Sequence, residues 1–201
     1  MSKTPILSPI ERTIISTTSA LYDNQINALI SKEELRDLFS EGQLMSKSWL
    51  LQHVSGLTNI QNIIVCGGWF GFLARALWEQ NNSLNVTSID TNPIATTVAG
   101  HILYNKGSAL LADMNQIDYS SFDCVVNTSL EHIASTKAWL ELIPSQTTVV
   151  VQSNDAFYIK DHVNCHKSVE ELVEELSLQK ILFAGALPFP MYKRLMVIGV
   201  K

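Results

Sequence analysis

Short apolar runs alternate with helical patterns along the last two thirds of the chain. The runs NIIVC, VTSID, SALLA, DCVVN and TTVVVQ, which begin at residue 62, are almost continuously apolar. Strands that are buried on both faces have this pattern, and helices between such strands produce a parallel sheet. We therefore expect helices between the runs and after the last of them, at 71–80, 93–104, 134–143 and 168–178.

The final residues show a different arrangement. KILFAGALP and LMVIGVK are two further strands, and the connection between them contains Pro188 and Pro190. This connection is too short for a crossover helix, so the last strand is expected to be antiparallel to its neighbour. The pattern predicts one doubly wound, mostly parallel, seven-stranded Rossmann-like sheet over residues 57–201, with an antiparallel last strand.

Residues 1–56 are predicted to form a helical N-terminal extension, which begins with a loose arm that its prolines interrupt. The segment SKEE (31–34) is a capping box, in which a serine and a glutamate satisfy free N–H groups at a helix start. We expect Gly42 to end that helix and a further short helix to cover 46–54.

The stretch 42–51 has two interpretations. It could fold over a bound ligand as a lid, with Lys47 and Trp49 facing the ligand. Alternatively, Trp49, Leu50 and Val54 simply pack this helix on the sheet. The sequence leaves both open.

Composition narrows the class of protein. The chain has 201 residues, 46% of them hydrophobic, and a net charge of −5, which suits one packed core and argues against a broad nucleic-acid surface. The three cysteines, Cys66, Cys124 and Cys165, match no zinc spacing and indicate a reduced, cytoplasmic protein. The most apolar stretch, 63–78, carries an arginine and is too short to cross a bilayer. No signal peptide or membrane association is expected.

The carboxyl ends of the strands are where doubly wound sheets bind ligands. The first strand runs into Gly67-Gly68-Trp69-Phe70-Gly71, where glycines permit a tight turn and close ligand approach. The alternative is a turn without a ligand. Asp90 ends the second strand, about where an acidic residue binds ribose hydroxyls. Both functions are possible at that turn, because Asn92 can cap the next helix while Asp90 faces a ligand.

Three segments resemble the class I S-adenosylmethionine-dependent methyltransferases. VTSIDTNP, LLADMNQID and SFDCVVNTSLEHI are similar to the second-, third- and fourth-strand motifs of that superfamily, and the likeness covers roughly residues 60–200. The fourth-strand motif is the most specific. The glycine loop is the least specific, because Trp69 stands where that superfamily normally has glycine.

This resemblance implies S-adenosylmethionine as the cofactor and assigns residues to it. The loop Gly67–Trp69 would pass under the methionine part, with the indole either stacked on the cofactor or packed under the first helix. Asp90 would accept from the ribose hydroxyls, and Asp113 from the adenine amino group. The remaining residues assigned to the cofactor are Thr91, Met114, Asn127 and Ser129, the last two near the sulfonium and methyl.

Glu131-His132 raises the question of a metal. Some RNA-end methyltransferases use paired Glu and His there with another glutamate three residues earlier, but Thr128 holds that position here. We therefore expect no metal. His132 and His162 are candidate general bases, and the alternative for His132 is a structural turn residue.

The connection 152–166, which follows the fifth strand, is rich in hydrogen-bonding groups. Polar loops at this edge often bind substrates, whereas the alternative is a solvated loop that makes its own turns. We expect Asn154, His162 and Tyr192 to border one substrate pocket.

The resemblance implies an S-adenosylmethionine-dependent methyltransferase, acting on a small molecule or a local site of a macromolecule. The alternative is a protein that binds S-adenosylmethionine without methyl transfer. A nicotinamide oxidoreductase is disfavoured because GGWFG lacks the spacing of a dinucleotide loop.

Overall fold

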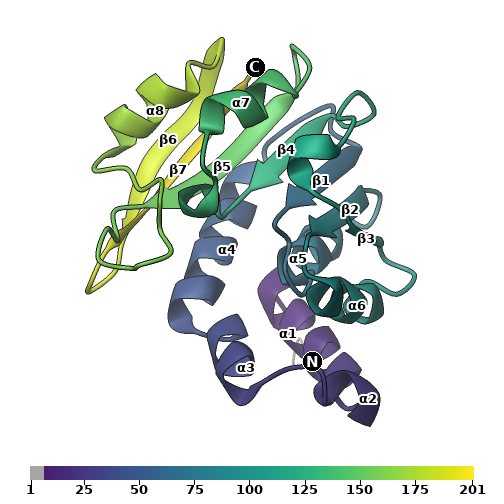
Figure 1. Cartoon of the computed structure of the whole chain (residues 1–201). Helices are drawn as coiled ribbons and strands as arrows, with labels where there is room; N and C mark the ends of the chain where they lie inside the picture. The colour runs from purple at the N-terminus through teal and green to yellow at the C-terminus, as the bar shows by residue number, and fades with distance from the viewer. Residues whose placement is uncertain (1–6) are drawn as a thin grey trace, which may run out of the picture.

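The computed structural model describes residues 7–201, and a single mixed sheet forms the centre of this part of the chain (Figure 1). Its strand order is β3-β2-β1-β4-β5-β7-β6, and β7 is antiparallel to both of its neighbours. The predicted doubly wound sheet with an antiparallel last strand is confirmed. The strands are β1 (Asn62–Cys66), β2 (Asn85–Asp90), β3 (Ser108–Leu111), β4 (Cys124–Asn127), β5 (Thr148–Asn154), β6 (Lys180–Pro188) and β7 (Lys193–Val200).

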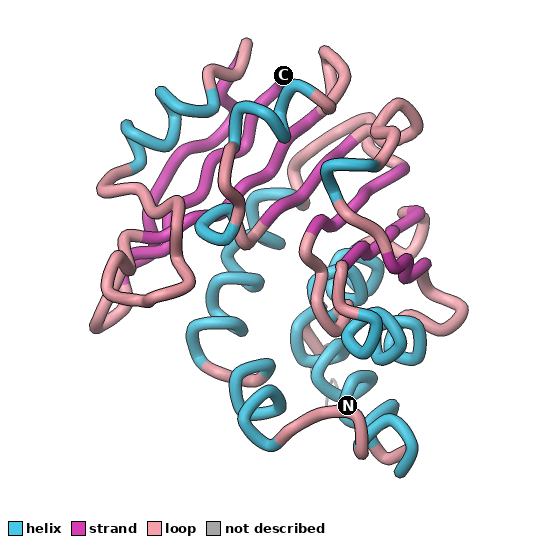
Figure 2. Tube along the Cα trace, viewed as in Figure 1, coloured by secondary structure: helices cyan, strands magenta, loops and turns pink. Residues whose placement is uncertain are grey.

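Helices cover both faces of the sheet (Figure 2). Helices α4 (Glu41–Val54) and α5 (Phe72–Gln80) pack on one face. Helix α6 (Pro93–Ile102) lies beside α5. Helices α7 (Thr136–Glu141) and α8 (Val169–Leu176) pack on the opposite face. Successive β1 side chains alternate between the two cores, as the pleat of a strand requires. Two short 3-10 turns, η1 (Met114–Gln116) and η2 (Leu130–His132), follow β3 and β4.

The N-terminal helices pack against this layer. They are α1 (Pro9–Leu21), α2 (Asn24–Asn27) and α3 (Lys32–Leu38). Residues 1–6 of the predicted loose arm lie outside the described residues. Pro9 opens α1 at its first position instead of interrupting an arm, because a helix start needs no N–H from that residue. None of the described helices is long and apolar enough to span a bilayer.

Two details of the N-terminal prediction have different outcomes. The capping box of α3 is formed. The Glu34 N–H donates to Ser31 Oγ at 3.1 Å, and the Ser31 N–H donates to Glu34 Oε2 at 2.9 Å. The prediction that Gly42 ends a helix is wrong, since Ser40 caps α4 and Gly42 lies in its first turn. A Cβ at Gly42 would lie 2.9 Å from Tyr192 Oη, so this glycine permits a close approach.

Candidate functional site

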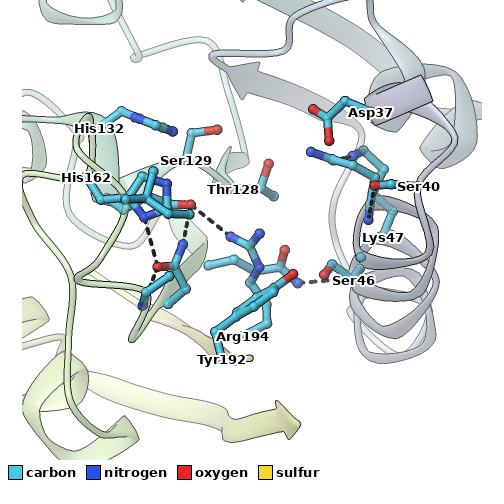
Figure 3. A pocket seen from close by; sticks show the side chains of 17 residues that line it. Asp37, Ser40, Ser46, Lys47, Thr128, Ser129, His132, His162, Tyr192 and Arg194 are labelled. Carbon is cyan, nitrogen blue, oxygen red and sulfur yellow. Dashed lines mark hydrogen bonds and ion pairs between the residues drawn. The ribbon is translucent and has the colours of Figure 1, made fainter. Parts of the chain in front are cut away.

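Two connected cavities lie at the carboxyl edge of the parallel strands. The first, here called the loop cavity, measures about 210 Å³ and is lined by Gly67, Gly68 and Trp69. The second, here called the histidine cavity, measures about 330 Å³ and includes His162 in its wall (Figure 3). The cavities form one continuous space, because six residues line both: Asp37, Gln43, Lys47, Thr128, Ser129 and His132.

The loop after β1 alternates in backbone conformation. Gly67, Trp69 and Gly71 have φ of 59°, 49° and 75°, in the left-handed region that favours glycine. Trp69 therefore occupies a glycine-type position, at a cost of about 1 kcal/mol. Its N–H donates to Asp90 Oδ2 at 2.8 Å, and its indole stacks on Phe70 with centroids 4.3 Å apart. The indole both packs against the N-terminal helices and lines the loop cavity.

The position of Gly68 has no room for a side chain. A Cβ at this position would lie 2.0 Å from Ser88 Oγ on β2. The Gly68 N–H donates to the Ile89 carbonyl at 2.9 Å, which holds the loop against the end of β2. The glycine pair thus keeps the backbone close to the sheet and leaves the space above it open.

Both carboxylate oxygens of Asp90 accept hydrogen bonds from backbone N–H groups. Oδ2 accepts the Trp69 N–H, and Oδ1 accepts the Asn92 N–H at 2.9 Å. Asn92 caps α6 through its own Oδ1. Thr91 beside it is exposed. Asp90 therefore holds the loop that follows β1 to the turn that follows β2, a function that the sequence did not reveal. Each oxygen still has a lone pair for a ligand hydroxyl.

The other residues assigned to the cofactor lie outside both cavities, except Ser129. Asp113 Oδ1 accepts the Asn115 N–H at 2.9 Å and caps η1. Asn127 is buried, with its Nδ2 at 3.6 Å from Met114 Sδ and its Oδ1 accepting the Ser129 N–H at 2.9 Å. Asn127 thus fixes the turn that places Ser129 in the wall of both cavities.

A buried ion pair lies at the base of the histidine cavity. Glu131, on η2, is 3% exposed. Its Oε1 accepts from Arg194 Nη1 at 3.0 Å and from Asn154 Nδ2 at 2.6 Å. Arg194 comes from β7 and its guanidinium lies 5.7 Å from the ring centre of Tyr192. The pair joins the turn after β4 to the antiparallel last strand.

The structure brings Asn154, His162 and Tyr192 to the histidine cavity. Asn154, however, forms hydrogen bonds within the protein through both its amide nitrogen and its amide oxygen. Its Nδ2 donates to Glu131, and its Oδ1 accepts the Ala156 N–H at 2.9 Å and faces His162 Nδ1 at 3.1 Å. Asn154 therefore orients its neighbours, and one of its two amide hydrogens is used by Glu131.

The two histidines approach each other across the cavity. The rings of His132 and His162 are 4.8 Å apart and nearly perpendicular. Burial lowers the pKa of His162 below its usual value. The neutral imidazole is therefore favoured, and a neutral imidazole can accept a proton or bind a ligand.

Helices α3 and α4 form the wall opposite the histidines (Figure 3). Lys47 lines both cavities and its Nζ donates to Gln43 Oε1. Burial, followed by repulsion from Arg194, lowers the pKa of Lys47 to about 7. Trp49 instead packs edge-on against Phe183, with ring centres 5.8 Å apart. The lid interpretation therefore fits Lys47, and the packing interpretation fits Trp49.

A second group of hydrogen-bonded polar side chains consists of Ser153, His166 and Glu175. Ser153 Oγ lies 2.8 Å from His166 Nδ1, and His166 Nε2 lies 2.5 Å from Glu175 Oε2. This resembles the order of a nucleophile, base and acid. Ser153 is completely buried and lines neither cavity. These hydrogen bonds therefore connect β5 to α8 and have a structural function.

Comparison with known proteins identifies the fold. No protein-family model matches the chain, and no curated protein matches its sequence. Solved structures do match. The N-methyltransferase NodS from Bradyrhizobium japonicum WM9, in complex with S-adenosyl-L-homocysteine, superposes with a TM-score of 0.65 at 15% identity, covering 92% of this chain and 98% of that one.

Two further structures agree. Magnesium protoporphyrin IX methyltransferase (ChlM) from Synechocystis PCC 6803 gives a TM-score of 0.64 at 12% identity, over 92% of this chain and 99% of that one. The plantazolicin methyltransferase BpumL gives 0.62 at 12% identity, over 96% and 98%. Both have S-adenosyl-L-homocysteine bound. The chain has the Rossmann-like fold of the class I S-adenosylmethionine-dependent methyltransferases.

Proposed function

We propose that this protein is an S-adenosylmethionine-dependent methyltransferase that acts on a small molecule or on a local site of a macromolecule. The observation that carries the proposal is the pair of connected cavities at the carboxyl edge of the sheet. Ligands bind at this edge in doubly wound folds. Structures with the same fold are methyltransferases with S-adenosyl-L-homocysteine bound, which supports this cofactor.

In this proposal the cofactor lies along the strand ends from β3 to β4. Its methionine part occupies the loop cavity, over the backbone of Gly67 and Gly68 and beside the Trp69 indole. Ser129, which lines both cavities, lies where the methyl group would face the histidine cavity. The ribose and adenine would be bound by Asp90, Thr91, Asp113 and Met114.

The proposed reaction is a direct displacement at the methyl carbon. A substrate nitrogen or oxygen forms a bond to that carbon as the carbon–sulfur bond breaks, and the leaving group is a neutral thioether. Positioning supplies most of the rate enhancement in such a reaction. When the nucleophile is a hydroxyl or amine, its proton must leave, and His132 and His162 lie in the cavity wall to accept it.

Activity is tested by production of S-adenosylhomocysteine from S-adenosylmethionine in the presence of a fractionated metabolite extract. Once a substrate is isolated, His162→Ala should lower turnover by about a hundredfold or more, the typical contribution of a general base. Cofactor affinity should stay within about a factor of three, which is roughly 0.7 kcal/mol. The matched control is His101→Ala, an exposed histidine on α6. Full activity of His162→Ala would contradict the proposed base, and lost cofactor binding would place His162 in the cofactor site.

A second candidate is a protein that binds S-adenosylmethionine without transferring its methyl group. Trp69 favours it, since an indole fills a glycine-type position beside the loop cavity. Calorimetry with S-adenosylmethionine separates the candidates. Tight binding without S-adenosylhomocysteine production from any fraction supports the second, and turnover excludes it.

A further inference from the structure

One carboxylate oxygen at the base of the histidine cavity is unsatisfied. Glu131 Oε1 has two donors, but Oε2 is buried without a hydrogen-bond partner among the described residues. A buried polar atom left unpaired costs about 1–3 kcal/mol, and more when it is charged. Since Glu131 lines the histidine cavity, a ligand entering that cavity can supply the missing partner.

The hydrogen bonds around His162 determine which ring nitrogen carries the hydrogen. Asn154 donates through Nδ2 to Glu131 and accepts the Ala156 N–H at Oδ1, so the orientation of its amide is fixed. His162 Nδ1 lies 3.1 Å from that same Oδ1 and must therefore be the donor. The Nε2 atom of neutral His162 consequently has a free lone pair.

His132 is arranged in the same way. Its Nδ1 lies 3.1 Å from the backbone carbonyl oxygen of Asp161, which can only accept. The neutral His132 ring therefore also has its lone pair on Nε2. One nitrogen of each histidine and one oxygen of Glu131 lie within 4.8 Å of one another.

We propose that Glu131, His132 and His162 bind a divalent transition-metal ion, of the kind of Zn²⁺ or Co²⁺, at the base of the histidine cavity. Two neutral imidazoles and one carboxylate are a ligand set that such ions favour. Ligating histidines usually donate their other ring N–H to a carbonyl or carboxylate group, and both histidines have an oxygen acceptor in that position.

The dimensions require the three side chains to close on the ion. Metal–ligand bonds are about 2.0–2.2 Å long, so ligand atoms of a tetrahedral site are about 3.4 Å apart. The candidate ligand atoms lie within 4.8 Å of one another, so the most distant of them must approach by about 1.4 Å. Three protein ligands leave coordination positions open for water or substrate. Arg194, paired with Glu131 Oε1, and Lys47 in the facing wall both weaken the affinity for a cation.

This proposal replaces the expectation of no metal. That expectation considered the turn 128–132, in which Thr128 leaves a ligand position empty. His162 belongs to a connection thirty residues further along the chain, and the fold returns it to the same cavity. Metal binding and the general-base function use the same lone pairs, so the two exclude each other.

The test is calorimetric titration of the untagged, chelator-treated protein with ZnCl₂, in the absence of S-adenosylmethionine. We expect one ion per chain, and an affinity that falls at least tenfold, about 1.4 kcal/mol, in Glu131→Gln, His132→Gln and His162→Gln. The control His101→Gln should match the parent protein. Titration with CoCl₂ should give visible d–d absorption that each of the three variants alters and the control does not.

Folding of each variant is checked by thermal melting. His132 is exposed, so His132→Gln decides the question even where Glu131→Gln is unstable. The proposal is overturned when the folded parent protein binds neither ion, or when His132→Gln binds as tightly as the parent. Because the titration contains no methyl donor, its failure leaves the proposed methyl transfer intact, and inactivity of the enzyme would leave the metal site intact.

Discussion

The two halves of the sheet's carboxyl edge are built differently. On the β1–β2–β3 half, Asp113 accepts a backbone N–H of its own turn, and Asp90 accepts one from its own turn and one from the loop after β1. On the β4–β5–β7 half, Glu131, Asn154 and Arg194 bond to one another across long sequence separations and enclose a cavity. The first half consists of turns held by bonds from backbone N–H groups to carboxylates, whereas the second is a network of side chains that bond to one another.

This difference predicts how each half responds to change. A substitution in a local turn should affect mainly the ligand or loop beside it. A substitution in the connected network leaves a buried charge unpaired, so it should affect the whole fold. Four experiments test this contrast.

The largest effect is expected at Arg194. Arg194→Met leaves the Glu131 carboxylate buried without its cation, and breaking a buried pair in this way costs about 3–5 kcal/mol. Urea denaturation should show this loss. The double variant Glu131→Gln/Arg194→Met should recover much of the stability, because no charge is left unpaired. A loss below about 1 kcal/mol in the single variant would show that the network does not depend on this pair.

Asp90→Ala should act on the ligand. In the proposed cofactor site it removes the charged acceptor of the ribose hydroxyls, which would be worth about 1.5–3 kcal/mol, so affinity for S-adenosylmethionine should fall at least tenfold in calorimetry. The control is Asp118→Ala, which also removes a carboxylate that accepts a backbone N–H in an exposed turn. Unchanged affinity with an intact fold would remove Asp90 from the proposed cofactor site.

Lys47 should make stability depend on pH. Its pKa is about 7 in the folded protein and near 10.4 when unfolded, so unfolding takes up a proton between these values and stability rises with pH. Relative to Lys47→Met, the parent protein should gain about 1 kcal/mol or more between pH 7 and pH 10. Exposed Lys137→Met is the control. Parallel stability curves for Lys47→Met and the parent would mean that Lys47 is solvated.

The smallest change is Trp69→Phe. It keeps an aromatic ring in the loop, so stability should change by less than about 1 kcal/mol. The fluorescence change on titration with S-adenosylmethionine should largely disappear in this variant and persist in Trp78→Phe. A signal that survives in full would separate Trp69 from the loop-cavity ligand.

The sequence predicted the sheet well because its signals are local. Each buried strand is a short apolar run, and the missing crossover before β7 reveals its direction. Helix limits were less accurate. A glycine such as Gly42 is typical of a helix end, but here it permits the close approach of Tyr192, which belongs to the connection between β6 and β7, 150 residues later.

The candidate site was predictable where strand ends and the connections beside them supply it. The glycine loop and Asp90 follow directly from strand ends, and so does the grouping of Asn154, His162 and Tyr192 at one cavity. The wall formed by Asp37 and Gln43, and the pairing of Arg194 with Glu131, depend on contacts between distant segments. The position of Arg194 could have been predicted. It lies at the start of an antiparallel strand, and this end of the strand is at the same edge of the sheet as Glu131. No pattern indicated that Asn154 would bond to Glu131 and to the Ala156 N–H.

The position of β7 has a consequence for folding. This strand follows all the others in the chain, yet it lies between β5 and β6, and its Arg194 completes the base of the histidine cavity. During synthesis β5 and β6 emerge first and have no hydrogen-bonding partner on their facing edges. Such edges can pair with other chains. The protein is therefore most vulnerable to aggregation in the interval before β7 is released, and the histidine cavity can form only when that interval ends.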